Sequence, residues 1–433
     1  MKSMEKQQTI ERMDKLMRRL FPICRSITGE GVRQTLGILS EYIPLEIREA
    51  ASGARAFDWT VPREWNIRDA YIKGPDGQKI VDFQKNNLHV MSYSAPVSAK
   101  MTLAELRPHL YSLPDQPDLV PYRTSYYDEG WGFCLSHNVL QALPEGEYEA
   151  VIDSELKDGS LTYGEYYLPG TTKDEILFSA YVCHPSMAND NLSGVVLAAF
   201  LARELAALPR RRYSYRFLFA PETIGALVWL SQNERHAKRV KHGLVMTCVG
   251  DAGAFTYKKS RQGAAEIDRA VMQVLRDSGQ EHNLMDFYPY GSDERQYCSP
   301  GFDLPVGCFM RTSYGKFPQY HTSADDLSFA NGENIQGTME KYLEVIALLE
   351  KNRRYRNLYP KGEPMLGRRG LYKKPGGAIE HPREGIGKLW VLNQSDGTKS
   401  LLDIAERSGL KFSEIAAAAE DLLEAKLIKV INS

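Results

Sequence analysis

Side chains that bind metals follow apolar runs in the middle of this chain. The run Ile176–Cys183, which we interpret as a buried strand, leads into His184 and then Asp190. In an open α/β sheet, ligands bind beyond the carboxyl ends of the strands. Alone, His184 would be interpreted as bonded to a loop carbonyl, and Asp190 as a helix N-cap. Together they favour a divalent metal held by imidazole and carboxylate.

Two more acids and a second histidine occupy comparable positions. Glu222 follows the strand-like run 215–220, Asp251 follows the run 243–249, and His321 lies in a polar, turn-rich loop. A carboxylate beside a metal-bound water is a natural general base, because the metal lowers the pKa of the water and the carboxylate takes its proton. We predict this role for Glu222. A solvated Glu222 and a turn role for Asp251 are the alternatives.

Four residues that flank the His321 loop are expected to line a substrate pocket: Asp293, Arg295, Arg311 and Tyr314. Either arginine is suited to hold a substrate carboxylate or to stabilise a tetrahedral oxyanion. Ordinary surface arginines are the alternative.

The elements that must position these groups alternate between strand and helix from residue 161 to residue 349. The strands are continuous apolar runs, as expected when helices cover both faces of a sheet. This pattern predicts a three-layer α/β/α domain, formed by residues 1–56 and 132–353. Residues 57–131 are rich in Trp, Tyr, Pro and Gly with short alternating runs, and they predict an inserted β-rich subdomain.

Two segments complete the chain. Residues 354–384, rich in Arg, Lys, Gly and Pro, predict a linker, and residues 385–433 predict a winged helix-turn-helix module. The second helix of this module, expected over 412–425, carries four acids against Lys411 and Lys426. Because phosphate repulsion would oppose its entry into a DNA groove, we expect a docking or protein-interaction role and no nucleic-acid binding.

The composition of the chain limits its expected partners and cellular location. Lys and Arg (54) nearly cancel Asp and Glu (55), so no global field attracts nucleic acid or an anionic membrane. No apolar run spans a bilayer and no signal-peptide core is present, so we expect a cytoplasmic protein without a membrane partner. The six cysteines form no CxxC pair, which argues against disulfides and a cysteine-based zinc site.

The chain resembles the co-catalytic zinc aminopeptidases, relatives of glutaminyl cyclase, in segments that occur in the same order: Cys183-His184, Asp190-Asn-Leu-Ser-Gly194, Glu222, Asp251, Ser292-Asp293 and Tyr320-His321-Thr-Ser-Ala-Asp325. As a whole it resembles a bacterial family of aminopeptidase-like proteins with an inserted β subdomain and a C-terminal winged helix. Members of that family are often associated with polysaccharide-biosynthesis gene clusters.

The resemblance implies the phosphorylase/hydrolase-like α/β/α fold of zinc exopeptidases and removal of N-terminal residues from peptides. It implies that His184, Asp190 and Asp251 hold one zinc, that Asp190 bridges to a second zinc completed by His321, and that Glu222 is the base. Thr223 stands where these relatives carry an acid ligand, and Ser186 where an acid often orients the first histidine. We therefore expect one firmly held zinc and a second that is weak or absent.

From these features we predict a zinc-dependent amide hydrolase, most simply an aminopeptidase. One alternative is a deacylase or cyclase acting on an N-acyl or aminoacyl substrate linked to polysaccharide biosynthesis. The other is a non-catalytic binding protein that kept the fold. The sequence leaves a homo-oligomer open.

Overall fold

The computed structural model describes residues 3–371 and 383–431. Its internal contacts divide the chain into two units. One is formed by residues 1–263 and 282–340, and the other by residues 264–281 and 341–433. In the described residues, no helix is both long and apolar enough to cross a membrane.

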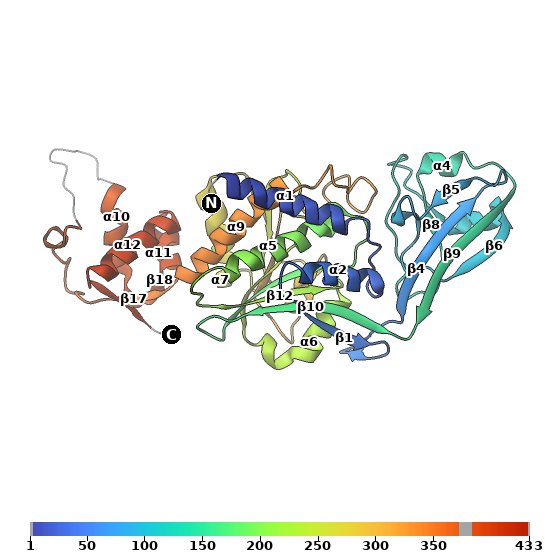
Figure 1. The fold of residues 1–433 in the computed structure, drawn as a ribbon. Coiled ribbons are helices and arrows are strands. Elements are labelled where there is room, and N and C mark those ends of the chain that lie inside the picture. Colours follow the sequence, from blue (N-terminus) through green and yellow to red (C-terminus); the bar gives the residue numbers. More distant parts are fainter. Residues whose placement is uncertain (1–2, 372–382, 432–433) are drawn as a thin grey trace. The chain divides into compact units, whose positions relative to one another are not determined.

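An eight-stranded mixed sheet forms the centre of the larger unit (Figure 1). In spatial order its strands are β1 (Glu46–Ala51), β10 (Ser160–Leu168), β12 (Ser214–Ala220), β11 (Glu175–Tyr181), β13 (Val240–Val245), β16 (Val306–Met310), β14 (Phe255–Lys258) and β15 (His282–Met285). The central strands β12, β11, β13 and β16 run parallel to their neighbours in this group. Every residue of β11 and β12 is buried, which matches their unbroken apolar sequences.

Helices cover both faces of this sheet. In Figure 1, α1 (Ser3–Leu20), α2 (Glu30–Ser40) and α5 (Gly194–Ala206) lie on one face, and α6 (Ile224–Ala237) lies on the other. Ten of the thirteen residues of α5 are buried, because it packs between the sheet and α1. The short α8 (Glu294–Tyr297) and the long α9 (Gly332–Lys351) follow later in the chain. This arrangement confirms the predicted three-layer α/β/α fold.

A second, four-stranded antiparallel sheet forms the inserted subdomain. Its order is β5 (Lys79–Asp82), β4 (Glu64–Lys73), β9 (Glu147–Lys157) and β6 (Val97–Thr102). The predicted boundary at residue 131 is wrong, since β9 pairs with both β4 and β6 and carries the subdomain on to Lys157. The alternating burial of β9 gives the sheet one apolar face, which packs on the short elements that join its strands. Those elements are η1 (Asn87–His89), α3 (Leu103–Leu106), η2 (Arg107–His109), β7 (Leu110–Tyr111), β8 (Phe133–Cys134) and α4 (His137–Gln141), and the small pair β2 (Arg55–Ala56) and β3 (Trp59–Thr60) precedes them.

The smaller unit contains the winged helix-turn-helix. Its elements are α7 (Glu266–Ser278), β17 (Arg354–Asn357), η4 (Leu366–Arg369), α10 (Arg383–Gln394), β18 (Asp396–Ser400), α11 (Leu401–Ser408), α12 (Phe412–Glu424) and β19 (Ile428–Ile431). The linker predicted from residue 354 is wrong at its start, because β17 pairs with β18 and β19 and belongs to the module. Residues 372–382 of that linker lie outside the described residues.

The first turn of α12 is held by α7 within this smaller unit. The backbone N–H of Phe412 donates to the Asp277 carboxylate at 2.8 Å. On the neighbouring helix α11, Asp403 and Glu406 both pair with Arg269 of α7 at 2.6 Å. Asp277 of α7 and the two acids of α11 are therefore used in contacts within the smaller unit.

Candidate metal centre and active site

The parallel pairing of β11 with β12 places His184 beside Glu222. Tyr181 and Ala220 end the two strands as register partners, so the segments that follow leave the same sheet edge together. The backbone N–H of Glu222 donates to Cys183 Sγ at 3.3 Å. As a result, His184 Nε2 lies 3.9 Å from the nearer oxygen of Glu222.

Three predicted ligands converge at this edge. Asp190 Oδ2 lies 2.9 Å from His321 Nε2 and 3.9 Å from His184 Nε2. The ligand atoms of all three residues lie within 4.8 Å of one another, and His184 and Asp190 are almost completely buried. Donor atoms around a tetrahedral zinc lie roughly 3.3 Å apart, given zinc–nitrogen bonds of about 2.0–2.1 Å. The two measured separations bracket that value, so this donor set fits a zinc ion.

The ionisation states of these residues also suit a metal. Burial lowers the pKa of His184 to about 4, which leaves its imidazole neutral and able to act as a ligand. Burial opposes ionisation of Asp190, but His184, His321 and the Tyr181 hydroxyl outweigh it and lower the pKa of this carboxyl to about 2. Tyr181 donates a short hydrogen bond to Asp190 Oδ1.

The segment Asp190-Asn-Leu-Ser-Gly194 is fixed by its own side chains. Asn191 Nδ2 donates to the Met246 carbonyl at 2.9 Å, and Ser193 Oγ donates to the Asn189 carbonyl at 2.7 Å. Gly194 lies so close to β13 that a Cβ there would be 2.2 Å from the Met246 carbonyl oxygen. These contacts explain the residue types of the motif: Asn191 and Gly194 hold the turn between β11 and α5 against the end of β13, and Ser193 closes the turn on itself.

Asp325, from the His321 loop, holds the same turn from the other side. Its two carboxylate oxygens accept the backbone N–H groups of Asn189 at 2.6 Å and Asp190 at 2.9 Å. Its main-chain carbonyl accepts the N–H of Ala188 at 2.8 Å. The loop that supplies one ligand therefore also positions another, a role that the sequence did not reveal.

We expect Asp325→Ala to destabilise the fold by about 1–3 kcal/mol for each of the two N–H groups that it leaves buried without an acceptor. The variant should also retain less metal, because Asp190 loses its backbone support. Urea unfolding and metal analysis measure both effects.

The matched control is Asp326→Ala, whose carboxylate accepts from nearby Ser328 and from the Phe329 N–H in one local turn contact. Since water can replace that contact, we expect a change within about 0.5 kcal/mol and normal metal content. Equal effects of the two substitutions would contradict the assigned role of Asp325.

Asp251 is not a member of the metal group, contrary to the prediction. Strand β13 ends at Val245, four residues before the predicted end, so Asp251 lies six residues beyond the sheet edge. Its oxygens accept from the Thr312 hydroxyl at 2.6 Å, the Gly253 N–H at 2.7 Å and Asn189 Nδ2 at 3.0 Å. With both oxygens engaged by protein donors, Asp251 braces the surrounding loops.

Glu222 lies within a cluster of charged side chains. Burial and the nearby carboxyl of Asp293 raise its pKa well above the usual value. Asp293 accepts the backbone N–H of Thr223 at 2.7 Å, and Arg295 Nη2 donates to the Thr223 hydroxyl at 2.9 Å. Two of the four predicted pocket residues, Asp293 and Arg295, therefore contact the residue that follows the proposed base.

The other two predicted pocket residues, Arg311 and Tyr314, have hydrogen-bond partners outside the metal group. The Arg311 guanidinium donates to Thr338 at 3.0 Å and to the Gly253 carbonyl at 3.1 Å, and it stacks over the Phe255 ring at 4.2 Å. It therefore joins β16 to α9 and does not face the metal group. The Tyr314 hydroxyl lies 3.2 Å from Lys258 Nζ, next to a buried ion pair.

The inserted subdomain carries site residues that sequence reasoning missed. The Tyr122 ring lies 5.3 Å from the His184 ring and 5.2 Å from the His321 ring. The Tyr122 N–H donates to the His321 carbonyl at 2.8 Å, and Val120 and Ser323 exchange further hydrogen bonds. This non-local pairing holds the His321 loop, and no local pattern signals it.

Backbone strain also marks this region. Ser186, Thr223, Cys248 and His321 all have positive φ angles between 39° and 64°, although none is glycine. Such residues cost on the order of 1–3 kcal/mol each and persist where the surroundings enforce them, often at functional sites. Ser186, expected to stand near the first histidine, donates instead to the Phe21 carbonyl at 2.9 Å.

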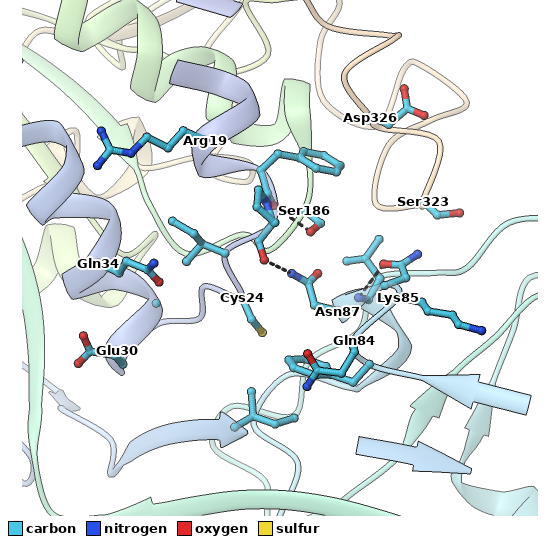
Figure 2. A pocket seen from close by; sticks show the side chains of 18 residues that line it. Arg19, Cys24, Glu30, Gln34, Gln84, Lys85, Asn87, Ser186, Ser323 and Asp326 are labelled. Atoms are coloured by element: carbon cyan, nitrogen blue, oxygen red, sulfur yellow. Dashed lines mark hydrogen bonds between the residues drawn. The ribbon is translucent and has the colours of Figure 1, made fainter. Parts of the chain in front are cut away.

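Two cavities are lined by residues that lie close in sequence to the metal group. One, of 240 Å³, contains Glu222 and Arg295 in its lining. The other, of 780 Å³, lies between the N-terminal helices and the inserted subdomain and is bordered by Ser186 and Ser323 (Figure 2). Its lining does not include Glu222, whereas that of the smaller cavity does, so the smaller cavity is the one next to the proposed base.

Comparison with known proteins identifies the family of the chain. Residues 14–352 match a domain of unknown function, DUF4910, and residues 353–430 match a winged helix-turn-helix. A Clostridium acetobutylicum protein named "Putative polysaccharide biosynthesis protein with aminopeptidase-like domain" is 55% identical over 416 residues, covering 96% of this chain and 95% of that protein.

Solved structures that resemble this chain support the same family and fold. The crystal structure of a "putative peptidase" from Clostridium acetobutylicum has a TM-score of 0.94 and 52% identity, covering 99% of this chain and 98% of that one. BSAP, a zinc aminopeptidase from Bacillus subtilis, has a TM-score of 0.57 at 12% identity, covering 79% of this chain and 94% of that one, which shows a shared fold. The chain therefore belongs to the DUF4910 family, whose aminopeptidase-like domain is here followed by a winged helix-turn-helix.

Proposed function

We propose that the protein is a zinc-dependent amide hydrolase, most simply an aminopeptidase, with Glu222 as its general base. The observation that carries the proposal is the convergence of two imidazoles on one buried carboxylate, with Glu222 3.9 Å from His184. Neutral histidines and an ionised aspartate are the forms that bind zinc.

The proposed mechanism assigns one task to each residue. His184, Asp190 and His321 would hold the metal. When bound, the metal would polarise the carbonyl of the substrate and lower the pKa of a water molecule. Glu222 would accept a proton from the attacking water and pass it to the amide nitrogen that leaves as the C–N bond breaks. Tyr181 and Asp325 keep Asp190 in place through the contacts described above.

The surroundings of Thr223 favour a single zinc. Its hydroxyl accepts from Arg295 and its backbone N–H donates to Asp293, so it faces a guanidinium and not a second metal. Asp251, the other acid expected to bind metal, is bonded to protein donors. In the described part of the chain, both candidate metal groups contain His184 and so describe one location.

A second candidate keeps this mechanism and changes the substrate to an N-acyl or aminoacyl group on a sugar. The observation that favours it is the name of the 55%-identical relative, which refers to polysaccharide biosynthesis. The two candidates differ in whether the protein cleaves substrates with a free N-terminal amine.

The first test is the metal content of the purified protein. We expect about one zinc per chain from the ligand set, and a large loss of zinc in His184→Ala. The control is His236→Ala at the exposed end of α6, which should retain full metal content. The proposed site would be overturned if the purified protein contained no zinc and its metal content were the same in the His184→Ala variant.

The second test is a substrate panel applied to the zinc-loaded protein. Aminoacyl-anilides, N-terminally blocked peptides and N-acyl sugars should be compared under the same conditions. Cleavage confined to free N-termini supports the aminopeptidase, and cleavage confined to N-acyl sugars supports the deacylase. Zinc binding without turnover on any of them would contradict the hydrolase and favour a binding protein.

A further inference from the structure

The 240 Å³ cavity beside Glu222 combines a cation with an aromatic wall. Its lining includes Glu222, Thr223 and Arg295 from the catalytic domain and Trp59, Tyr126 and Tyr127 from the chain around the inserted subdomain. A substrate group placed in this cavity would contact the proposed base and the guanidinium together.

Arg295 is unusual for a partly buried arginine. Nη2 donates to the Thr223 hydroxyl at 2.9 Å, but Nε is buried and has no hydrogen-bond partner among the described residues. In the same described part of the chain, no carboxylate lies within ion-pair distance of its guanidinium. Buried charges are normally paired, and an unmatched buried donor destabilises a fold. The geometry therefore leaves Arg295 available for an anionic ligand.

Three aromatic residues line the same cavity. The rings of Trp59 and Tyr127 meet edge to face at 5.6 Å, and 41% of Trp59 and 49% of Tyr127 remain exposed. Tyr126 is held by a hydrogen bond, with its hydroxyl 2.9 Å from that of Tyr122. Large exposed aromatic rings at the mouth of a cavity are typical of ligand contact.

We infer that this cavity is the specificity subsite of the proposed hydrolase and that it binds a substrate group carrying a carboxylate through Arg295. The inference rests on the proposed function and names the substrate class that the function leaves open. The aromatic wall would cover the carbon stem or ring of that group. The natural substrate would then be an amide whose acyl residue is acidic, such as an N-terminal glutamyl residue or its sugar-acid equivalent.

The charge around Arg295 favours a carboxylate over a phosphate. Asp293 and Glu294 precede it directly in sequence, and Glu222 lines the same cavity. These carboxyl groups would repel a dianionic phosphate more strongly than a monoanionic carboxylate. A planar carboxylate also matches the paired N–H groups of a guanidinium, which Lys does not offer.

The test compares L-glutamyl and L-leucyl p-nitroanilides with the full-length, zinc-loaded protein. We expect a higher kcat/KM for the glutamyl substrate. Arg295→Gln should reduce the glutamyl-to-leucyl ratio of kcat/KM about 10–100-fold, as expected for loss of a charge-assisted hydrogen bond. Arg295→Lys, which keeps the charge but not the paired geometry, should give an intermediate ratio. The control Arg48→Gln alters an exposed arginine paired with Glu46 on β1 and should leave the ratio unchanged.

A binding measurement separates this inference from the proposed function. Calorimetric titration of the Glu222→Gln protein with L-glutamate, L-glutamine and inorganic phosphate should show glutamate binding most tightly, with the preference lost when Arg295→Gln is added. If no anilide is cleaved but this preference is present, the subsite stands and the hydrolase proposal fails. An Arg295→Gln variant that keeps the wild-type substrate ratio and the glutamate preference would overturn the subsite, as would tighter binding of phosphate.

Discussion

Glu222→Gln is expected to slow hydrolysis about 10²–10⁴-fold while the protein keeps its zinc, because glutamine has nearly the same shape but cannot take a proton. The three metal-group residues are unchanged in this variant, so its metal content should match the wild type. Steady-state rates on the best substrate of the panel, together with metal analysis of the same sample, measure both quantities.

The matched control for this variant is Glu234→Gln, which removes an exposed carboxylate from the later part of α6. It should not change the rate. Glu222 comes two residues before α6 begins, and Glu234 lies within α6. Comparing the two variants therefore separates the effect of a carboxylate in the site from the effect of a charge near that helix. Persistent activity in the zinc-bound Glu222→Gln protein would show that the base is another group.

Lys258→Met is expected to destabilise the larger unit by about 3–5 kcal/mol, because it leaves the buried Glu294 carboxylate without its partner. Lys258 Nζ lies 2.6 Å from Glu294 Oε1, and both side chains are almost inaccessible to solvent. The same ammonium group donates to the Tyr290 carbonyl at 2.7 Å. Chemical unfolding followed by circular dichroism measures the loss.

The neighbouring Lys259 provides a matched control. It pairs with Asp286 at 2.9 Å, but Asp286 is 90% exposed. Surface pairs contribute about 0–1 kcal/mol, so Lys259→Met should have little effect. The double substitution Lys258→Met with Glu294→Gln should recover part of the loss, since no unpaired charge then remains buried. Equal stability of the two single variants would contradict the assigned role of the buried pair.

The buried pair also supports the proposed subsite. Glu294 stands between Asp293, which accepts the Thr223 N–H, and Arg295, which donates to the Thr223 hydroxyl. Anchoring this short helix through Lys258 therefore fixes both contacts to the residue after Glu222. A loss of stability at Lys258 should be accompanied by weaker discrimination between glutamyl and leucyl substrates.

The sequence by itself determined the central sheet and the groups at its edge. Continuous apolar runs identified β11 and β12 as buried strands, and the residues that follow them, His184, Asp190 and Glu222, lie where parallel strands bring them together. His321 was found from a local motif, and the structure places it against Asp190. The strands and the proximity of these groups could be predicted because strand periodicity and turn chemistry are local properties of the chain.

Tertiary structure alone decided the rest. Asp251 follows an apolar run, but the paired part of β13 ends at Val245, and pairing depends on neighbouring strands and not on local sequence. Likewise β9 joins the inserted sheet through partners in strand β4 that come 76 to 93 positions earlier in the chain, far outside any local window. The choice between Arg295 and Arg311, and the part played by Asp325, depended on which side chains long-range packing brings to the same place.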